Sequence, residues 1–184
     1  MNYPMNIDEL VPGVRRPRVA TVWLDGCSGC HMSLLDMDER LIELASRIDL
    51  VCSPYLDTKG IPHDLDVAIV EGAVSSSEDL QKVTELRAHS RILVSLGDCA
   101  VTGNIPAMRN PFPLEDVLRR SYADSLPSRY VPALRSRVSP VHEVVPVDIY
   151  LPGCPPPADA IYYLLSELAA GRLPDTQYLS RFGR

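Results

Sequence analysis

Short apolar segments rich in β-branched residues alternate along this chain with segments whose apolar residues recur at helical spacing. The strands that this pattern predicts are Arg18–Leu24, Ile48–Cys52, Asp66–Glu71, Arg91–Leu96 and Asp148–Leu151. The predicted helices span about 31–46, 77–89 and 157–170, with Gly171 after the last of them. Strands that alternate with helices usually form a parallel sheet that is covered by helices on both faces.

One long stretch lacks this alternation because it is rich in proline. Eleven of the 17 prolines lie between Pro106 and Pro157, and proline restricts φ and removes a backbone donor. Only a short helix near 114–120 is expected in this stretch. We therefore predict one α/β domain, an open, doubly wound, mostly parallel, flavodoxin-like sheet with a proline-rich irregular insertion. The domain is expected over 18–174, with an N-terminal arm over 1–17 and a C-terminal tail over 175–184.

Charge and hydropathy exclude several classes of protein. The formal net charge of the 184 residues is −6, which argues against a basic face for nucleic acid. The apolar segments are far shorter than the ~20 residues that span a bilayer. The first residues are neither basic nor followed by a long apolar segment, so no secretory signal is expected. These features predict a cytoplasmic chain with neither a nucleic-acid partner nor a membrane span.

The cysteines are the residues that most directly indicate a function. There are five, and in a reducing compartment cysteines serve as ligands, nucleophiles or core residues rather than disulfides. Cys27 and Cys30 follow the first predicted strand, Cys99 the fourth and Cys154 the fifth. Loops after the carboxyl ends of parallel strands emerge at one edge of the sheet, where such folds bind ligands. We therefore expect these four thiols to meet at one rim, and Cys52 to be a small buried residue.

The loops around these four cysteines are suited to a close backbone approach. They read Asp25-Gly-Cys-Ser-Gly-Cys30, Gly97-Asp-Cys-Ala100 and Pro152-Gly-Cys-Pro-Pro156. Four thiolates with nearby amide donors suit an iron–sulfur cluster, whose potential depends on hydrogen bonds to sulfur and on burial. A structural zinc ion, a dithiol redox pair and inert core cysteines remain alternatives at this point.

Taken together, four segments resemble the small subunit of the nickel–iron hydrogenases. They are Trp23–Ser33, Val70–Ala73, Gly97–Gly103 and Leu151–Pro156, and the resemblance extends over residues 18–172. In that family the fold is flavodoxin-like. The resemblance implies one [4Fe–4S] cluster, next to the hydrogenase active site, with iron ligands Cys27, Cys30, Cys99 and Cys154. Such a subunit transfers electrons, and the chemistry of dihydrogen belongs to its partner.

The subtype follows from the number of cysteines, because none comes after Cys154. A small subunit with a single cluster resembles that of the soluble, cytoplasmic, NAD-reducing bidirectional hydrogenases. The resemblance implies two kinds of partner: a large subunit with the Ni–Fe centre, and a diaphorase module with iron–sulfur clusters, FMN and the NAD site.

Three other functions are alternatives to this interpretation. The quinone-site cluster subunit of respiratory complex I has two adjacent cysteines in its first motif, whereas this chain has Cys27-Ser-Gly-Cys30. An FMN-binding flavodoxin-like domain would place a phosphate loop where Cys27–Cys30 lie. A scaffold that uses zinc to hold its loops is a third class of function.

Glu71 is the candidate catalytic residue. It ends the third predicted strand, so its carboxylate is expected at the same rim, where burial would raise its pKa. The hydrogenase family has a matching glutamate near the subunit interface, which implies a proton relay for Glu71. His31 is expected to be solvated at the start of a helix, and the alternative is that it donates a hydrogen bond to a sulfide of the cluster. Trp23 and Leu24 are expected to shield the sulfurs from water.

The arginines of the proline-rich stretch form the last candidate site. Arginines on one surface could dock against the acidic face of another subunit; scattered, solvated arginines are the alternative. The residues in question are Arg119, Arg120, Arg129, Arg135 and Arg137.

Overall fold

A computed structural model of the chain describes residues 15–175, apart from residues 124 and 128. Its centre is a parallel sheet with the strand order β2-β1-β3-β5-β7. This is the flavodoxin-like order, so the predicted fold class is confirmed. The predicted strands agree with the observed ones to within one residue at each end. The observed strands are β1 Arg18–Trp23, β2 Asp49–Cys52, β3 Leu65–Glu71, β5 Ser90–Leu96 and β7 Ile149–Leu151.

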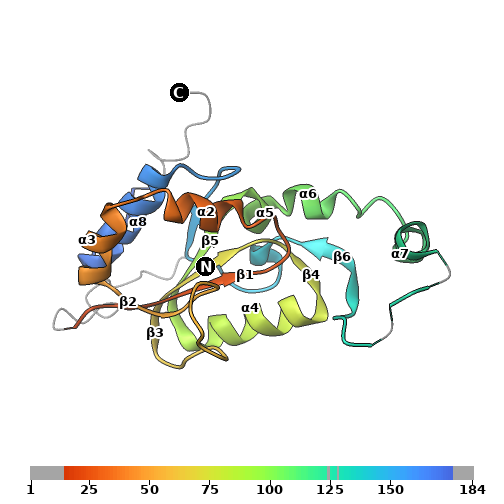
Figure 1. The fold of residues 1–184 in the computed structure, drawn as a ribbon, viewed down its shortest axis with the longest axis horizontal. Coiled ribbons are helices and arrows are strands. Elements are labelled where there is room, and N and C mark those ends of the chain that lie inside the picture. The colour runs from red at the N-terminus through yellow and green to blue at the C-terminus, as the bar shows by residue number, and fades with distance from the viewer. Residues whose placement is uncertain (1–14, 124, 128, 176–184) are drawn as a thin grey trace.

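Helices cover both faces of this sheet (Figure 1). On one face lie α2 (Gly29–Leu35), α3 (Arg40–Arg47) and α8 (Ala158–Ala169), and on the other lies α4 (Ser77–His89). Alternate residues of β3 enter the two separate cores: Ile69 packs towards α2, α3 and α8, whereas Val70 packs towards α4. A strand that is buried on both faces reads as a continuous apolar run, which is how β3 appears in the sequence.

The segment predicted as one helix over 31–46 forms two helices instead. The chain turns between α2 and α3, and Asp38 has a left-handed φ of 52°. Met37 lies within this turn but is only 1% exposed. The buried Met37 continues the apolar spacing of a helix across the break, which is why periodicity does not reveal it.

The ends of α4 and α8 follow their sequence signals. Ser76 and Asp79 form a reciprocal capping box at the start of α4, in which each side chain accepts the other's backbone N–H (3.1 and 2.8 Å). Helix α8 begins after Pro157 and ends just before Gly171, whose φ is +69°.

The proline-rich stretch is more ordered than predicted. Helix α5 (Gly97–Thr102) precedes it, and the stretch itself is occupied by α6 (Asn104–Ala107), α7 (Leu114–Tyr122), β6 (Leu134–Ser139) and the 3₁₀ turn η1 (Val141–Glu143). Strand β6 pairs antiparallel with β4 (Val74–Ser76) in a second, two-stranded sheet. The sequence pattern predicts neither of these two strands.

Helix α7 projects from the body of the molecule (Figure 1). None of its residues is buried. Acidic residues occupy its first turn, and Arg119 and Arg120 occupy its last.

Across the part of the chain that the structure describes, there is no helix with both the length and the apolar character that crossing a membrane requires.

Candidate functional site

The rim at the carboxyl end of the sheet carries four of the five cysteines. Cys27 lies in the loop after β1, Cys30 in α2, Cys99 in α5 after β5, and Cys154 in the loop after β7. Burial raises the pKa of the Cys30 thiol, and the charges of Glu71 and the other three cysteines raise it further. Burial likewise raises the pKa of Cys99, followed by the charges of Cys154 and Cys27. The structure therefore brings thiols from three loops into one electrostatic environment.

Two glycines permit this close approach. Gly97 has a φ of +80°, and a Cβ at this position would overlap the Sγ of Cys30. Gly153 has a φ of +142°, and a Cβ there would lie 2.6 Å from the Cα of Pro156. Both positions need the conformational freedom and the small size of glycine. At the rim, the backbone of Gly97 therefore packs directly against the sulfur of Cys30.

Hydrogen bonds connect the loops that carry the cysteines. Asp98 donates its backbone N–H to the carbonyl of Gly153 (2.9 Å), and its Oδ1 accepts the N–H of Gly153 (2.7 Å). Ser33 of α2 donates its hydroxyl to the carbonyl of Pro156 (2.6 Å). The loop of Cys154 is therefore fastened on one side to the residue before Cys99 and on the other to the helix of Cys30.

Asn104, which is not among the residues that the sequence predicts for the site, contacts the thiol of Cys154 directly. Its Nδ2 lies 3.6 Å from the Sγ of Cys154, and a hydrogen bond from the same side chain lowers the pKa of Cys99, against the raising effect of burial. In the sequence, Asn104 is marked only by its place directly after Thr102-Gly103. Its distance from Cys154 along the chain does not predict the contact, which depends on the turn between α5 and α6.

Glu71 lies at the same rim, at the end of β3, and is only 2% exposed. Its carboxylate accepts the backbone N–H groups of Cys30 (3.1 Å) and His31 (2.9 Å) and also contacts the imidazole Nδ1 of His31. Burial raises the pKa of Glu71, but these hydrogen bonds and the charge of His31 outweigh it, so the pKa is lowered. The predicted rise in pKa is therefore wrong, because sequence alone does not show these partners.

His31 is buried, with 1% of its surface exposed, so the prediction of a solvated residue is wrong. Its Nε2 lies 3.1 Å from the hydroxyl of Thr21, which in turn donates to Ser53 (2.9 Å). Tyr55 donates its hydroxyl to the carbonyl of His31 (2.6 Å). A chain of polar groups thus leads from Glu71 through His31 and Thr21 to Ser53.

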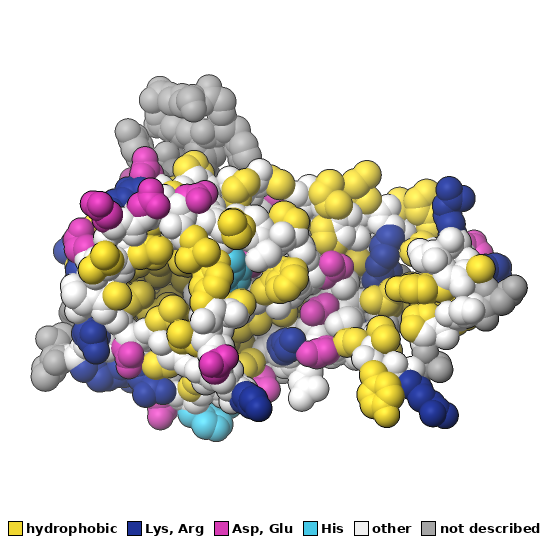
Figure 2. Space-filling view, in the orientation of Figure 1, with side chains coloured by type: hydrophobic (Ala, Val, Ile, Leu, Met, Phe, Trp, Pro, Cys, Tyr) yellow, Lys and Arg dark blue, Asp and Glu magenta, His cyan; other side chains and the backbone are white. Residues whose placement is uncertain are grey.

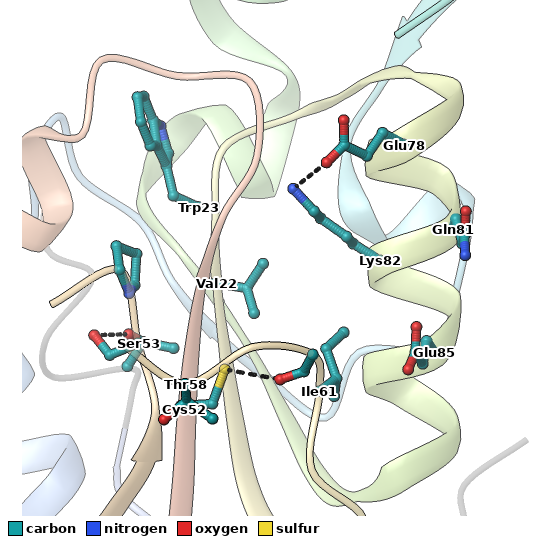
Figure 3. A pocket seen from close by; sticks show the side chains of 13 residues that line it. Val22, Trp23, Cys52, Ser53, Thr58, Ile61, Glu78, Gln81, Lys82 and Glu85 are labelled. Carbon is teal, nitrogen blue, oxygen red and sulfur yellow. Dashed lines mark hydrogen bonds and ion pairs between the residues drawn. The ribbon is translucent and has the colours of Figure 1, made fainter. Parts of the chain in front are cut away.

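This chain of polar groups reaches a pocket of about 420 Å³ beside the rim, between β1, the loop after β2 and α4 (Figure 3). Trp23 stands at the pocket with 46% of its surface exposed, and its indole N–H donates to Gly26 (3.2 Å). Leu24 is buried, whereas Trp23 is not, and the shielding of the sulfurs by these two side chains stays a prediction. Cys52 is half-buried and lines this pocket rather than the rim.

No three His, Cys, Asp or Glu side chains within residues 15–175, leaving aside 124 and 128, are arranged to hold a single metal ion. A four-iron cluster gives each of its four thiolates a separate iron. Ligands of a cluster therefore surround a volume and need not close on one point.

The fold and the rim define the class of this chain: a flavodoxin-like α/β domain with four cysteines on the carboxyl edge of its sheet. Residues 27–168 match the family model of the NADH ubiquinone oxidoreductase 20 Kd subunit, and the chain belongs to this family.

Individual relatives are hydrogenase subunits. The chain is 43% identical to the NAD-reducing hydrogenase HoxS subunit delta of Cupriavidus necator, over 84% of this chain and 79% of that protein. It is 39% identical to a subunit of the F420-non-reducing hydrogenase of Methanothermobacter thermautotrophicus, over 86% of this chain but only 56% of that protein.

Solved structures give the same result. A chain in the crystal structure of an NAD+-reducing nickel–iron hydrogenase in the H2-reduced state matches with a TM-score of 0.86 and 38% identity, over 92% of this chain and all of the other. A nickel–iron–selenium hydrogenase of Desulfomicrobium baculatum matches with a TM-score of 0.56 at 18% identity, which shows the fold alone.

These comparisons confirm the recognition of the chain as a small subunit of the NAD-reducing nickel–iron hydrogenase type, and hence as a subunit of an oxidoreductase. The family model carries the name of a respiratory subunit, which was the alternative reading. The relatives at 43% and 38% identity favour the hydrogenase side of the family.

Proposed function

We propose that this chain is the electron-transfer subunit of a soluble, cytoplasmic NAD-reducing nickel–iron hydrogenase and holds one [4Fe–4S] cluster. The proposed iron ligands are Cys27, Cys30, Cys99 and Cys154. The observation that carries the proposal is the convergence of these four thiols from three loops on one rim, where each of Cys30 and Cys99 is affected by the charges of its neighbours.

The chemistry of these thiols fits a cluster. Burial and the charges of neighbouring groups raise the pKa of Cys30 and Cys99, which disfavours their thiolate forms in the absence of a cation. Bound metal removes the protons from coordinating thiols outright, so iron supplies the positive charge that this rim lacks. The glycine at 97, which leaves room for the Cys30 sulfur, supports the same interpretation. The cluster, when bound, supplies one-electron transfer.

The exposed side of the rim supports docking of the subunit that holds the Ni–Fe centre. Cys27 and Cys154 are exposed, whereas Cys30 is buried. Exposed apolar side chains lie on α2 and along α6, on the same edge of the molecule (Figure 2). They include Met32 (57% exposed), Leu35 (39%), Ile105 (65%) and Met108 (67%). A partner that covers this edge would exclude water from the sulfurs, which tunes the potential of a cluster.

We propose the lobe around α7 as a docking surface for the acidic face of another subunit, the diaphorase module that carries iron–sulfur clusters, FMN and the NAD site. Residues 104–139 contain six Arg and three Asp or Glu, a net charge of +3, within a chain of net charge −6. Arg109 and Arg135 are not available for docking, because they donate to backbone carbonyls of the two-stranded sheet formed by β4 and β6. Arg119 and Arg120 lie exposed on the projecting helix α7.

For Glu71 we propose the role of a proton relay, which the family resemblance implies. The polar groups of His31, Thr21 and Ser53 support it, because they lead from the Glu71 carboxylate to the pocket. The same carboxylate also fixes the first turn of α2 through the N–H groups of Cys30 and His31. A test of Glu71 must therefore separate proton transfer from positioning.

The test of the whole proposal is anaerobic purification of the chain with the subunits that accompany it. We expect broad iron–sulfur absorption, about four irons and four sulfides per chain, and reduction of NAD by dihydrogen. Cys99→Ser and Cys154→Ser should each lose this absorption. Structured flavin bands on this chain alone would favour an FMN domain, and a colourless, zinc-loaded chain would favour a scaffold. Co-purification with quinone-reducing subunits only would favour the complex I-type reading.

A further inference from the structure

The carboxamide of Asn104 occupies a distinctive position between two of the rim loops. Its Nδ2 lies 3.6 Å from the Sγ of Cys154, a residue 50 positions further along the chain. Asn104 follows the helix that carries Cys99, so a side chain from the segment after β5 touches the sulfur of the loop after β7.

The local backbone aims this side chain at the rim. Helix α5 ends at Gly103, whose φ is +85° and whose N–H donates to the carbonyl of Cys99 (3.0 Å). Thr102 then ties the turn together: its hydroxyl donates to the carbonyl of Asp98 (2.8 Å) and accepts the N–H of Asn104 (3.3 Å). Asn104 itself has a φ of +32°, a region in which asparagine is enriched. The turn thus fixes the backbone of Asn104 beside the rim.

The chemistry of the neighbours determines what this amide does. Thiolate sulfur is an acceptor, so the NH₂ end of the carboxamide, which carries two donors, is the end that faces it. Hydrogen bonds to ligand sulfurs are among the features that set the reduction potential of an iron–sulfur cluster. A donor stabilises the more negative, reduced cluster more than the oxidised one.

We propose that Asn104 raises the reduction potential of the cluster by donating a side-chain N–H to the sulfur of Cys154. The proposal rests on the proposed function, because it needs the cluster on the four cysteines. It assigns no part in proton transfer or in dihydrogen chemistry to Asn104.

The experiment is a redox titration of the reduced cluster, followed by electron paramagnetic resonance, on the complex purified anaerobically with its partner subunits. Asn104→Gly removes the donors and tolerates the positive φ at this position. Asn104→Ser also removes the carboxamide and leaves a hydroxyl that is too short to span the distance to Cys154. We expect a lower midpoint potential in both variants, with the iron content of the wild-type complex.

Asn110→Gly is the matched control. The Asn110 carboxamide bonds the backbone of Val138 (2.8 and 2.9 Å) and lies in the lobe, not on a sulfur. Its removal should leave the midpoint potential unchanged. Potentials equal to the wild type in both Asn104 variants, or an equal shift in Asn110→Gly, would overturn the inference. A wild-type complex without cluster signals would instead overturn the proposed function itself, so the two failures are distinguishable. If Asn104→Gly fails to assemble, the potential of Asn104→Ser decides alone.

Discussion

Asp98 and Gly153 are joined by two hydrogen bonds that run in opposite directions. The backbone N–H of Asp98 donates to the Gly153 carbonyl at 2.9 Å, and the N–H of Gly153 donates to the Asp98 carboxylate at 2.7 Å. Each of these residues directly precedes a rim cysteine, Cys99 and Cys154 respectively. The pair therefore fixes the separation of two proposed cluster ligands that lie 55 residues apart in sequence.

Asp98→Ala should loosen this connection, whereas Asp98→Asn should preserve it. Alanine leaves the N–H of Gly153 without its acceptor. Loss of a hydrogen bond to a charged group lowers the free energy of unfolding by about 1.5–3 kcal/mol. Asparagine keeps an oxygen at the same place and should cost less. We expect Asp98→Ala to lower both the free energy of unfolding and the iron content per chain, as measured by urea denaturation and metal analysis. Equal iron content in the two variants would contradict this account of the rim.

Gly97→Ala tests the cradle around the Cys30 sulfur. Gly97 and Gly60 have nearly the same positive φ, +80° and +81°, but only Gly97 has close neighbours: a Cβ at Gly60 meets nothing within 4 Å. The left-handed conformation costs a non-glycine residue about 1–2 kcal/mol in either place. Gly60→Ala should therefore lose stability but keep the iron–sulfur absorption. Gly97→Ala should lose that absorption as well, because its methyl group overlaps the Sγ of Cys30.

If both alanine variants retain the same iron–sulfur absorption, close contact at Gly97 has no bearing on cluster binding. If both lose it, general destabilisation is the cause. The comparison thus separates backbone strain from steric exclusion at the sulfur.

The central sheet could be predicted because its signal is local. Buried parallel strands such as β3 are continuous apolar runs, and their order follows from the handedness and length of helical connections. The second sheet could not be predicted in this way. Strand β6 reads Leu-Arg-Ser-Arg-Val-Ser, with only two apolar residues, and pairs with β4 about sixty residues earlier. It is held in place by Arg109, which donates to backbone carbonyls on both strands.

In the candidate site, too, one part could be predicted from the sequence and another could not. The meeting of the cysteines follows from one topological rule, because each comes after a strand of the same parallel sheet. The surroundings of the thiols do not follow from this rule. His31 is buried between two polar partners: the carboxylate of Glu71 on β3 lies against its Nδ1, and the hydroxyl of Thr21 on β1 lies against its Nε2. Asn104 reaches Cys154 only through the turn that follows α5. Such contacts depend on the relative positions of separate loops, which spacing along the chain does not encode.

Glu71→Gln and Thr21→Val together separate proton transfer from positioning. Glu71→Gln removes both the charge and part of the anchoring of the Cys30 and His31 N–H groups. Thr21→Val keeps the shape of the side chain and leaves those bonds intact, but it interrupts the path between His31 and Ser53. As a relay predicts, both variants should reduce NAD with dihydrogen more slowly while their iron–sulfur absorption stays normal. Slow turnover in Glu71→Gln alone would assign Glu71 a positioning role, and normal turnover in both would exclude the relay.

Arg120→Glu tests the lobe around α7 as a docking surface. The side chain is exposed near the end of a helix that has no buried residue, so the substitution should not disturb the fold. Reversing a charge at the periphery of a protein–protein interface mainly slows association and changes its salt dependence. We expect less of the diaphorase module to co-purify with Arg120→Glu, with a larger deficit at low salt than at high salt. Lys59→Glu makes the same change of charge in the exposed loop after β2 and should retain every subunit. Equal recovery of the module with both variants, at every salt concentration, would leave α7 without a role in docking.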